Sequence, residues 1–277
     1  MARIILIETS TSRCSIGIAE DGICTHYKES PEPRAHAAMT VPYIKEVLDE
    51  AGLRVKDCDA VCVSKGPGSY TGLRVGSSTA KGLCFGAGIP LIAIGTLDIL
   101  AAQGLATLKA LHGTSIDASA IIPMIDARRM EVYTAVFSPD GRQLTPTVST
   151  VITAGSFAAE LAAGPVLFVG DGAAKCRPVL TSPNAIFPDT PSGPGSADGS
   201  FTASAADSDS GRGAGSAAGS GPDPFAGCPK ASSMAALAEA AFRAGRFEDT
   251  AYFEPFYLKD FVAALPRNPF IPTKRDA

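Results

Sequence analysis

The spacing of apolar residues in the first third of the chain predicts three consecutive strands. Residues 3–8 form an apolar run, residues 14–20 alternate apolar with polar side chains, and residues 23–29 continue in an extended pattern. Between the last two runs stands the pair Asp21 and Gly22, which is typical of a two-residue hairpin because glycine accepts a positive φ. The chain therefore begins as a meander with at least one tight hairpin.

Two stretches with helical spacing follow the meander. Apolar side chains recur every three or four positions over residues 35–51, and Gly52 stands where a helix commonly ends. Pro42 lies inside this stretch, so the helix either starts there or kinks. The remaining elements of this part are a strand at 58–64, a helix at 71–87 and a strand at 90–94. The order βββ-α-β-α-β predicts an α/β fold with right-handed crossovers.

The second half of the chain carries weaker versions of the same signals. A helix is expected over residues 233–244, with Ser232 or Ser233 as its cap. Strands are expected at 121–126, 131–137 and 166–169, and a short helix at 156–163. Residues 190–232 consist mainly of Gly, Ser, Ala, Pro and Asp. Because such a segment buries little apolar surface, we expect a disordered insertion there.

Composition limits the functions that this chain can have. The 277 residues are 45% hydrophobic and 19% charged, which is enough to build a folded core. The net charge of −4 and the absence of tryptophan argue against a chain that binds RNA tightly by itself, although a local basic patch is compatible with a negative total. We therefore expect any RNA to be held mainly by a partner.

Metal, membrane and secretion signals are absent from the sequence. None of the three histidines lies at metal-ligand spacing to another, and the seven cysteines include no CxxC pair. No apolar run reaches the ~18 to 20 residues of a membrane helix, and the first residues lack the pattern of a signal peptide. We therefore expect a cytoplasmic protein with free thiols and without a metal site of its own.

Two turns carry residues that are typical of phosphate binding. The first strand ends in a Ser/Thr-rich turn whose backbone N–H groups can hold an anion, and a glycine loop precedes the helix that Thr71 can cap. The loop lacks the GK[ST] ending of a P-loop, and an ordinary turn is the alternative interpretation. The candidate phosphate or nucleotide ligands are Glu8, Thr9, Ser10, Thr11, Gly66, Gly68 and Ser69.

Glycines and charges in two other segments leave alternatives open. The helix over residues 71–87 contains Gly72, Gly76 and Gly86, although each glycine costs a helix about 1 kcal/mol relative to alanine. Another backbone must therefore come close, either within the fold or across a subunit interface. Asp126 and Glu131 flank a charged turn, where they form either a pair of carboxylates or a solvated hairpin tip.

Four motifs in a fixed order carry a resemblance to one family. The chain contains ILIETSTSRCSIGIAEDG, KGPGSYTGLRVG, MIDARRMEVY and EPFYLKDF, and it resembles the TsaB (YeaZ) family over residues 1–180 and 233–262. The resemblance implies two ribonuclease H-like lobes of the actin, Hsp70 and sugar kinase superfamily. On this basis residues 1–100 form the first lobe, residues 101–189 and 233–265 form the second, and the insertion at 190–232 has no counterpart in the family pattern.

The same resemblance implies a function in tRNA modification. Members of the family are non-catalytic subunits that dimerise with TsaD and activate it. TsaD transfers threonylcarbamoyl to the adenosine at position 37 of tRNAs that read codons starting with adenine. The ATPase TsaE joins the pair, and TsaC makes the threonylcarbamoyl adduct. The resemblance further implies that tRNA is reached only through the complex, that ATP or ADP would bind at the complex interface, and that the chain alone forms a homodimer.

The similarity to TsaD also indicates that this chain is not itself an enzyme. TsaD has two metal-binding histidines after the strand that matches residues 90–94, and the corresponding positions here are Thr96 and Leu100. Glu8 stands where nucleotide-binding relatives commonly have Asp, which puts nucleotide–metal binding in doubt. The residues expected at the partner interface are Met39, Tyr43, Val47, Thr71, Gly72, Val75, Gly76, Thr79 and Ala80.

Two alternatives from other functional classes stay open at this point. One is a free-standing nucleotide-dependent transferase that uses Glu8 and the loop from Gly66 to Gly72. The other is an inactive relative of glycoprotease-like peptidases, for which no zinc ligands or catalytic triad can be assembled from the sequence. An RNA-binding module that acts alone is disfavoured by the charge and the small number of aromatic residues.

Overall fold

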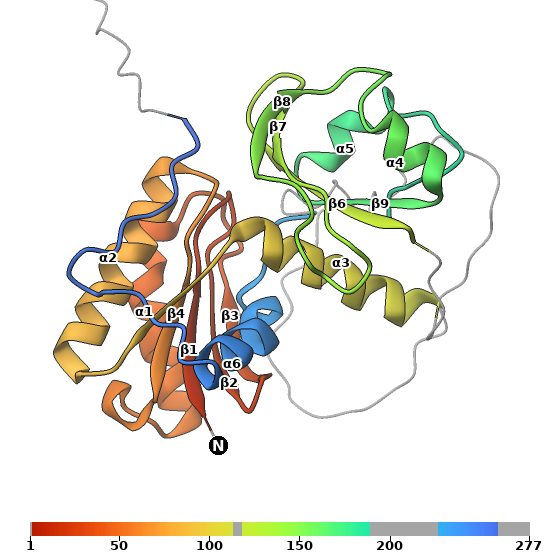
Figure 1. The fold of residues 1–277 in the computed structure, drawn as a ribbon. Coiled ribbons are helices and arrows are strands. Elements are labelled where there is room, and N and C mark those ends of the chain that lie inside the picture. The colour runs from red at the N-terminus through yellow and green to blue at the C-terminus, as the bar shows by residue number, and fades with distance from the viewer. Residues whose placement is uncertain (1, 113–117, 189–226, 260–277) are drawn as a thin grey trace, which may run out of the picture.

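The computed structural model describes residues 2–112, 118–188 and 227–259, which form two lobes with one five-stranded sheet each (Figure 1). The first sheet has the order β3-β2-β1-β4-β5, with antiparallel pairing in the meander and parallel pairing in the rest. Its strands are β1 (Arg3–Glu8), β2 (Ser15–Glu20), β3 (Ile23–Glu29), β4 (Ala60–Ser64) and β5 (Leu91–Ile94). The predicted order of elements in this lobe is confirmed.

Both faces of the first sheet are covered, which explains why β1 is apolar at successive positions. Ile5 and Ile7 pack against α1 (His36–Ala51) and α2 (Tyr70–Ala87). Ile4 and Leu6 point to the opposite face because successive strand residues alternate. There they meet the 3₁₀ helix η2 (Ala231–Met234) and α6 (Ala235–Arg243).

The second sheet has the order β10-β9-β6-β7-β8. Its strands are β6 (Ala120–Asp126), β7 (Glu131–Thr134), β8 (Val148–Val151), β9 (Val166–Val169) and β10 (Ala185–Ile186). The helices α4 (Ala158–Ala163) and α5 (Ala173–Cys176) cover one face, and α3 (Thr96–His112) covers the other and connects the lobes (Figure 1). Of the helices in the described residues, none has the length and apolar character needed to cross a membrane.

The position of α6 corrects the predicted domain boundaries. We assigned residues 233–265 to the second lobe, but α6 lies against the first sheet. The physical reason is that the face of β1 and β4 opposite α1 and α2 is itself apolar and must be covered. Ala238 and Ala241 are small enough to bring α6 close to Ile4 and Leu6 on that face.

Several element ends also differ from the predicted ones. Ser69, and not Thr71, caps α2, because its hydroxyl oxygen accepts the Gly72 N–H at 3.3 Å. Ser233 donates instead to the side chain of Gln103 at 3.2 Å, so α6 follows η2 without a side-chain cap. The helix α1 runs through Pro42 and ends at Ala51, with Gly52 as its C-cap, as expected. The predicted strand 131–137 ends at residue 134, and α3 and β8 were not predicted.

Candidate functional site between the lobes

A fully buried glutamate marks the end of β1. Ser10 donates two hydrogen bonds, from its backbone N–H and its hydroxyl, to Oε1 of Glu8, both at 2.6 Å. The other oxygen, Oε2, has no hydrogen-bond partner among the described residues. Burial disfavours the charged form and raises the pKa of Glu8 from 4.5 to about 7. The carboxyl group of Glu8 is therefore poised to gain or lose a proton near neutral pH.

The predicted phosphate-binding residues come together, and the backbone N–H groups of Thr9, Ser10 and Ser69 are paired within the chain. The N–H of Thr9 donates to the Ser64 hydroxyl at 3.4 Å, and the N–H of Ser69 donates to the carbonyl of Ser10 at 2.6 Å. A Cβ atom on Gly68 would lie 2.1 Å from the same Ser10 carbonyl oxygen. The two loops thus pack directly on each other, and phosphate binding by them stays a prediction.

The glycines at the start of α2 serve packing inside the first lobe. A Cβ atom on Gly72 would lie 2.0 Å from the Thr9 carbonyl oxygen, and one on Gly76 would lie 2.3 Å from the Thr9 hydroxyl oxygen. Gly66 has a φ of 107°, and its Cβ would meet the Phe256 carbonyl oxygen at 2.5 Å. At Gly72 and Gly76 the close neighbour inferred from the sequence is therefore the protein's own chain, whereas Gly86 has nothing within 4 Å of its Cβ position.

This packing corrects part of the predicted partner interface. Tyr43 and Val47 of α1 and Gly72, Gly76 and Ala80 of α2 are buried on the sides of the helices that face the sheet, so these five residues offer almost no surface to another subunit. Their burial follows from the apolar face that each helix turns toward the sheet. The other predicted interface residues, Met39, Thr71, Val75 and Thr79, keep accessible surface.

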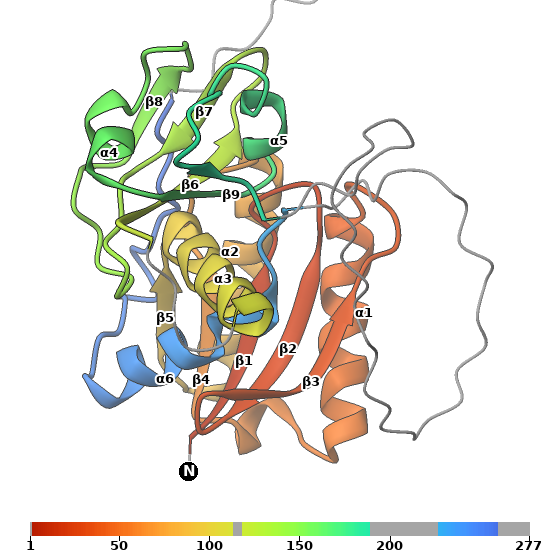
Figure 2. The same ribbon diagram turned by 90° about the vertical axis from the view of Figure 1, so that its right-hand side faces the viewer.

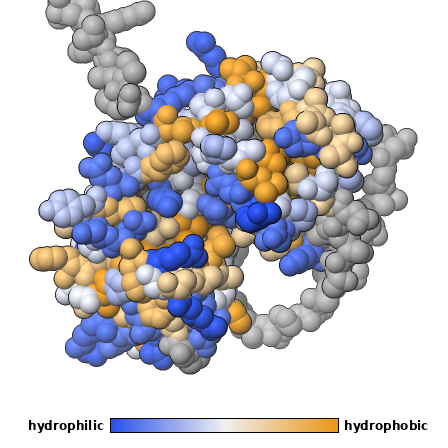
Figure 3. Space-filling view, viewed as in Figure 1, coloured by the Kyte–Doolittle hydropathy of each residue, from blue (hydrophilic) through white to orange (hydrophobic). Residues whose placement is uncertain are grey.

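The outward face of these two helices has an apolar surface that the sequence reading missed. Phe85 is 88% exposed and Val41 is 62% exposed. Gly82 and Gly86 have open space where a Cβ would be. Gly82 and Gly86 follow Val75 at helical spacing, so helical periodicity over residues 71–87 is the signal that could have located this surface. Apolar side chains are visible on this side of the first lobe in Figure 3.

The turn between β6 and β7 contains two carboxylates that do not pair with each other. Lys175 binds Asp126 and also donates to the Glu131 carbonyl at 2.7 Å. The Glu131 carboxylate accepts a hydrogen bond from Lys259 at 2.5 Å. Asp171 accepts the Asp126 N–H at 3.0 Å, and desolvation raises the pKa of Asp171 to about 6. The structure thus excludes a pair of carboxylates at Asp126 and Glu131, and each carboxylate is bound by a lysine in place of being solvated only.

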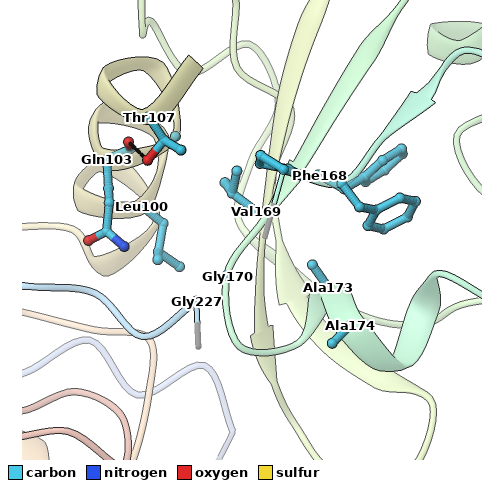
Figure 4. A pocket seen from close by; sticks show the side chains of 12 residues that line it. Leu100, Gln103, Thr107, Phe168, Val169, Gly170, Ala173, Ala174 and Gly227 are labelled. Carbon is cyan, nitrogen blue, oxygen red and sulfur yellow. Dashed lines mark hydrogen bonds between the residues drawn. The ribbon is translucent and has the colours of Figure 1, made fainter. Parts of the chain in front are cut away.

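Residues 227–232, which the sequence predicts to be the end of the insertion, lie between the two lobes. The rest of the predicted insertion lies within residues 189–226, outside the described part of the chain. Gln103 of α3 donates to the Cys228 carbonyl at 3.1 Å and accepts the Lys230 N–H at 3.1 Å. A Cβ on Gly227 would lie 2.6 Å from the Gly170 carbonyl. Figure 4 shows Gly227 beside Gly170, at a cavity of about 30 Å³. That volume suits water rather than a ligand, whose pockets run to roughly 300 Å³ or more.

The two positions that match metal-binding histidines are packed into the fold. Thr96 and Leu100 at the start of α3 are buried, and the Thr96 N–H donates to the Gly66 carbonyl at 2.9 Å. Across the parts of the chain that the structure describes, no three His, Cys, Asp or Glu side chains are grouped as a metal site. The residues at these two positions provide no imidazole, carboxylate or thiolate ligand.

Comparison with known families gives one match over most of the chain. The family model described as "TsaD: tRNA N6-adenosine threonylcarbamoyltransferase" matches residues 30–265. The TsaB protein of Haemophilus influenzae is 38% identical over 130 residues, which are 47% of this chain and 51% of that protein. The Escherichia coli TsaB protein is 34% identical over 139 residues, 50% of this chain and 56% of that protein. The chain thus spans about half the length of these curated relatives.

Two further comparisons extend over more of the chain. An uncharacterized protein of Mycobacterium tuberculosis is 30% identical over 194 residues, which are 69% of this chain and 82% of that protein. The solved structure of YeaZ from Pseudomonas aeruginosa superposes with a TM-score of 0.66 at 24% identity, over 93% of this chain and 100% of that chain. This likeness shows that the two chains share their fold.

Proposed function

The chain belongs to the family described as TsaD: tRNA N6-adenosine threonylcarbamoyltransferase and, within it, to the TsaB (YeaZ) proteins, and on this premise we propose that it takes part in forming threonylcarbamoyladenosine on tRNA. In this proposal the chain is the non-catalytic subunit that dimerises with TsaD and activates it. TsaE would join the pair, and TsaC would supply the threonylcarbamoyl adduct. The burial of Thr96 and Leu100, which lack metal-binding groups, supports a non-catalytic role.

The observation that carries the partner role is the outward surface of α1 and α2. Phe85 exposes 88% of its surface, and the neighbouring Gly82 and Gly86 leave room for another chain to approach closely. Apolar side chains beside small residues favour helix packing across an interface, because burial of the ring removes apolar area from water. Val41 of α1 adds to the apolar surface on the same pair of helices.

Nucleotide, in this proposal, binds at the interface of the assembled complex. The carboxyl of Glu8 faces its own turn, and the donors of Thr9, Ser10 and Ser69 are paired within the chain. A phosphate bound here by this chain alone would have to displace these contacts.

The test measures capture of TsaD by α2-surface variants. We expect the double variant Gly82→Arg/Phe85→Asp to lose at least tenfold in capture of purified TsaD and in reconstituted tRNA modification. Both positions face open space or solvent, and the substitution at Gly82 removes a glycine from the helix, so the melting temperature should be preserved or slightly raised. Gly155→Arg is the matched control, because Gly155 of the second lobe also has nothing within 4 Å of its Cβ position. Full capture and full activation by the α2 double variant would refute the proposed interface.

A further inference from the structure

Basic and aromatic side chains gather along one edge of this acidic protein and cross from the first lobe to the second. We name this edge the arginine–tyrosine ridge. It includes three of the chain's six tyrosines, although the total charge is −4. Its members are Tyr70, Arg74, Arg128, Arg129, Tyr133, Tyr257 and Lys259.

The end of the ridge on the first lobe is a column of one guanidinium group and two tilted tyrosine rings. The Arg74 guanidinium lies 4.3 Å from the centroid of the Tyr70 ring. The Tyr70 ring in turn lies 4.8 Å from the Tyr257 ring, at a tilt of 42°. Arg74 is exposed and forms no ion pair with a described carboxylate. Its planar group therefore extends the column of rings outward into solvent.

The C-terminal strap, residues 247–259, carries the ridge from one lobe to the other. The Phe256 N–H donates to the Lys65 carbonyl at 2.6 Å, which fixes the strap to the first lobe. Three residues later, Lys259 lies 5.8 Å from the centroid of the Tyr133 ring in the second lobe. Figure 2 shows the strap, in blue, rising from the first lobe toward β7 and β8.

The end of the ridge on the second lobe is an unusual turn that presents two arginines. Arg128 and Arg129 have φ values of 74° and 49°, a region that residues with a Cβ rarely adopt. Asp126 holds the turn by accepting the Arg128 N–H at 2.8 Å. The two carboxylates of the turn are bound by Lys175 and Lys259. The guanidinium groups of Arg128 and Arg129 are therefore exposed without an ion pair to any described carboxylate.

We propose that the arginine–tyrosine ridge binds single-stranded RNA, a contact that this subunit adds to the complex. Exposed arginines contact phosphates, and unpaired bases stack on aromatic rings and on guanidinium planes. A surface that binds an acidic protein needs cations, but it does not need aromatic rings such as those in the column of Arg74, Tyr70 and Tyr257. The column therefore favours RNA as the partner. The identification of this RNA as tRNA rests on the proposed function.

The test compares two charge-reversal variants that change the net charge equally. Arg128→Glu/Arg129→Glu alters the ridge, and Arg142→Glu/Arg246→Glu alters exposed arginines elsewhere. The probes are an unmodified tRNA transcript and its anticodon stem-loop, and binding is followed by fluorescence anisotropy over a salt series. Both the chain alone and the chain assembled with TsaD are measured. Capture of TsaD is recorded separately, so a failed interface is distinguished from a failed ridge.

We expect the ridge variant to bind RNA at least tenfold more weakly at about 0.1 M salt, with a salt slope reduced by roughly 1.4 for two lost phosphate contacts. The control variant should stay within twofold of wild type. Tyr257→Leu should weaken binding roughly 5- to 100-fold without a change in slope. Tyr252→Leu, on the same strap and 84% exposed, should leave binding unchanged.

Three results would overturn the ridge proposal. One is an equal loss of affinity in the ridge and control variants. Another is loss of TsaD capture by the Arg128→Glu/Arg129→Glu variant with RNA affinity intact, which would mark an acidic protein as the occupant. The third is absence of RNA binding by the wild-type chain both alone and in the complex.

Discussion

Adding one methyl group at Gly76 should destabilise the first lobe, whereas the same addition at Gly82 should stabilise it. Both glycines lie in α2, where replacement by alanine gains about 1 kcal/mol of helix propensity. The Cβ at Gly76 would lie 2.3 Å from the hydroxyl oxygen of Thr9 and 3.4 Å from Cγ2 of Val63. The Cβ at Gly82 would meet nothing within 4 Å. The two variants therefore separate backbone propensity from packing.

The size of the loss at Gly76 follows from what the methyl group displaces. Overpacking of a close-packed interior costs about 1–3 kcal/mol. The Thr9 hydroxyl also donates to the Gly72 carbonyl at 2.9 Å, and breaking this buried hydrogen bond costs about 1–3 kcal/mol more. After the gain in helix propensity, Gly76→Ala should lower the free energy of unfolding by about 3 kcal/mol. Gly82→Ala should raise it by about 1 kcal/mol.

Urea titrations followed by circular dichroism measure both variants, and thermal scans provide a second readout. At roughly 2–4 °C per kcal/mol for a chain of this size, Gly76→Ala should melt about 6–12 °C lower and Gly82→Ala about 2–4 °C higher. The reasoning is refuted if Gly76→Ala is as stable as the wild type. It is also refuted if the two variants shift in the same direction by the same amount, because propensity alone would then account for both.

Two further predictions concern a buried acid and the C-terminal strap. Because the pKa of Glu8 is raised, the folded state keeps a proton on this carboxyl over a pH range in which the unfolded state releases it. The stability of the fold with respect to this group is therefore fully present below pH 4.5 and is lost as the pH rises to about 7. Unfolding free energy should fall by about 2–3 kcal/mol between pH 5 and pH 8 relative to Glu8→Gln, and parallel pH profiles would contradict this. Lys81→Met should remove donors from the Ala251 and Phe253 carbonyls and speed hydrogen exchange in the strap at least tenfold, with unchanged exchange in β1 as the control.

The local pattern of the sequence was sufficient to predict the elements of the first lobe that lie within residues 3–94. The continuous apolar run of β1 reflects burial on both faces, and the Asp21–Gly22 turn specifies the hairpin. The helical spacing over residues 35–51 also predicted α1, but the residues of α1 and α2 that face the sheet were assigned in part to a partner interface. These signals are local, because a helix or strand repeats its geometry every few residues.

The roles of single residues in the candidate site depended on partners far away in the chain. Nothing near Gly72 in the sequence indicates that Thr9, 63 residues earlier, fills the space beside it. Glu131 is neutralised by Lys259, which lies 128 residues away. The small apolar side chains of α6 likewise fit either lobe by pattern alone.

The sequence by itself thus determined the order of elements over residues 3–94 and the family resemblance. Only the tertiary structure decided which glycines adjoin the chain's own backbone, which carboxylates are paired, and which side chains form the arginine–tyrosine ridge. The physical reason is that the periodicity of a segment indicates which of its side chains are buried. It does not indicate which other segment packs against them, because that depends on contacts between parts of the chain that are far apart in the sequence.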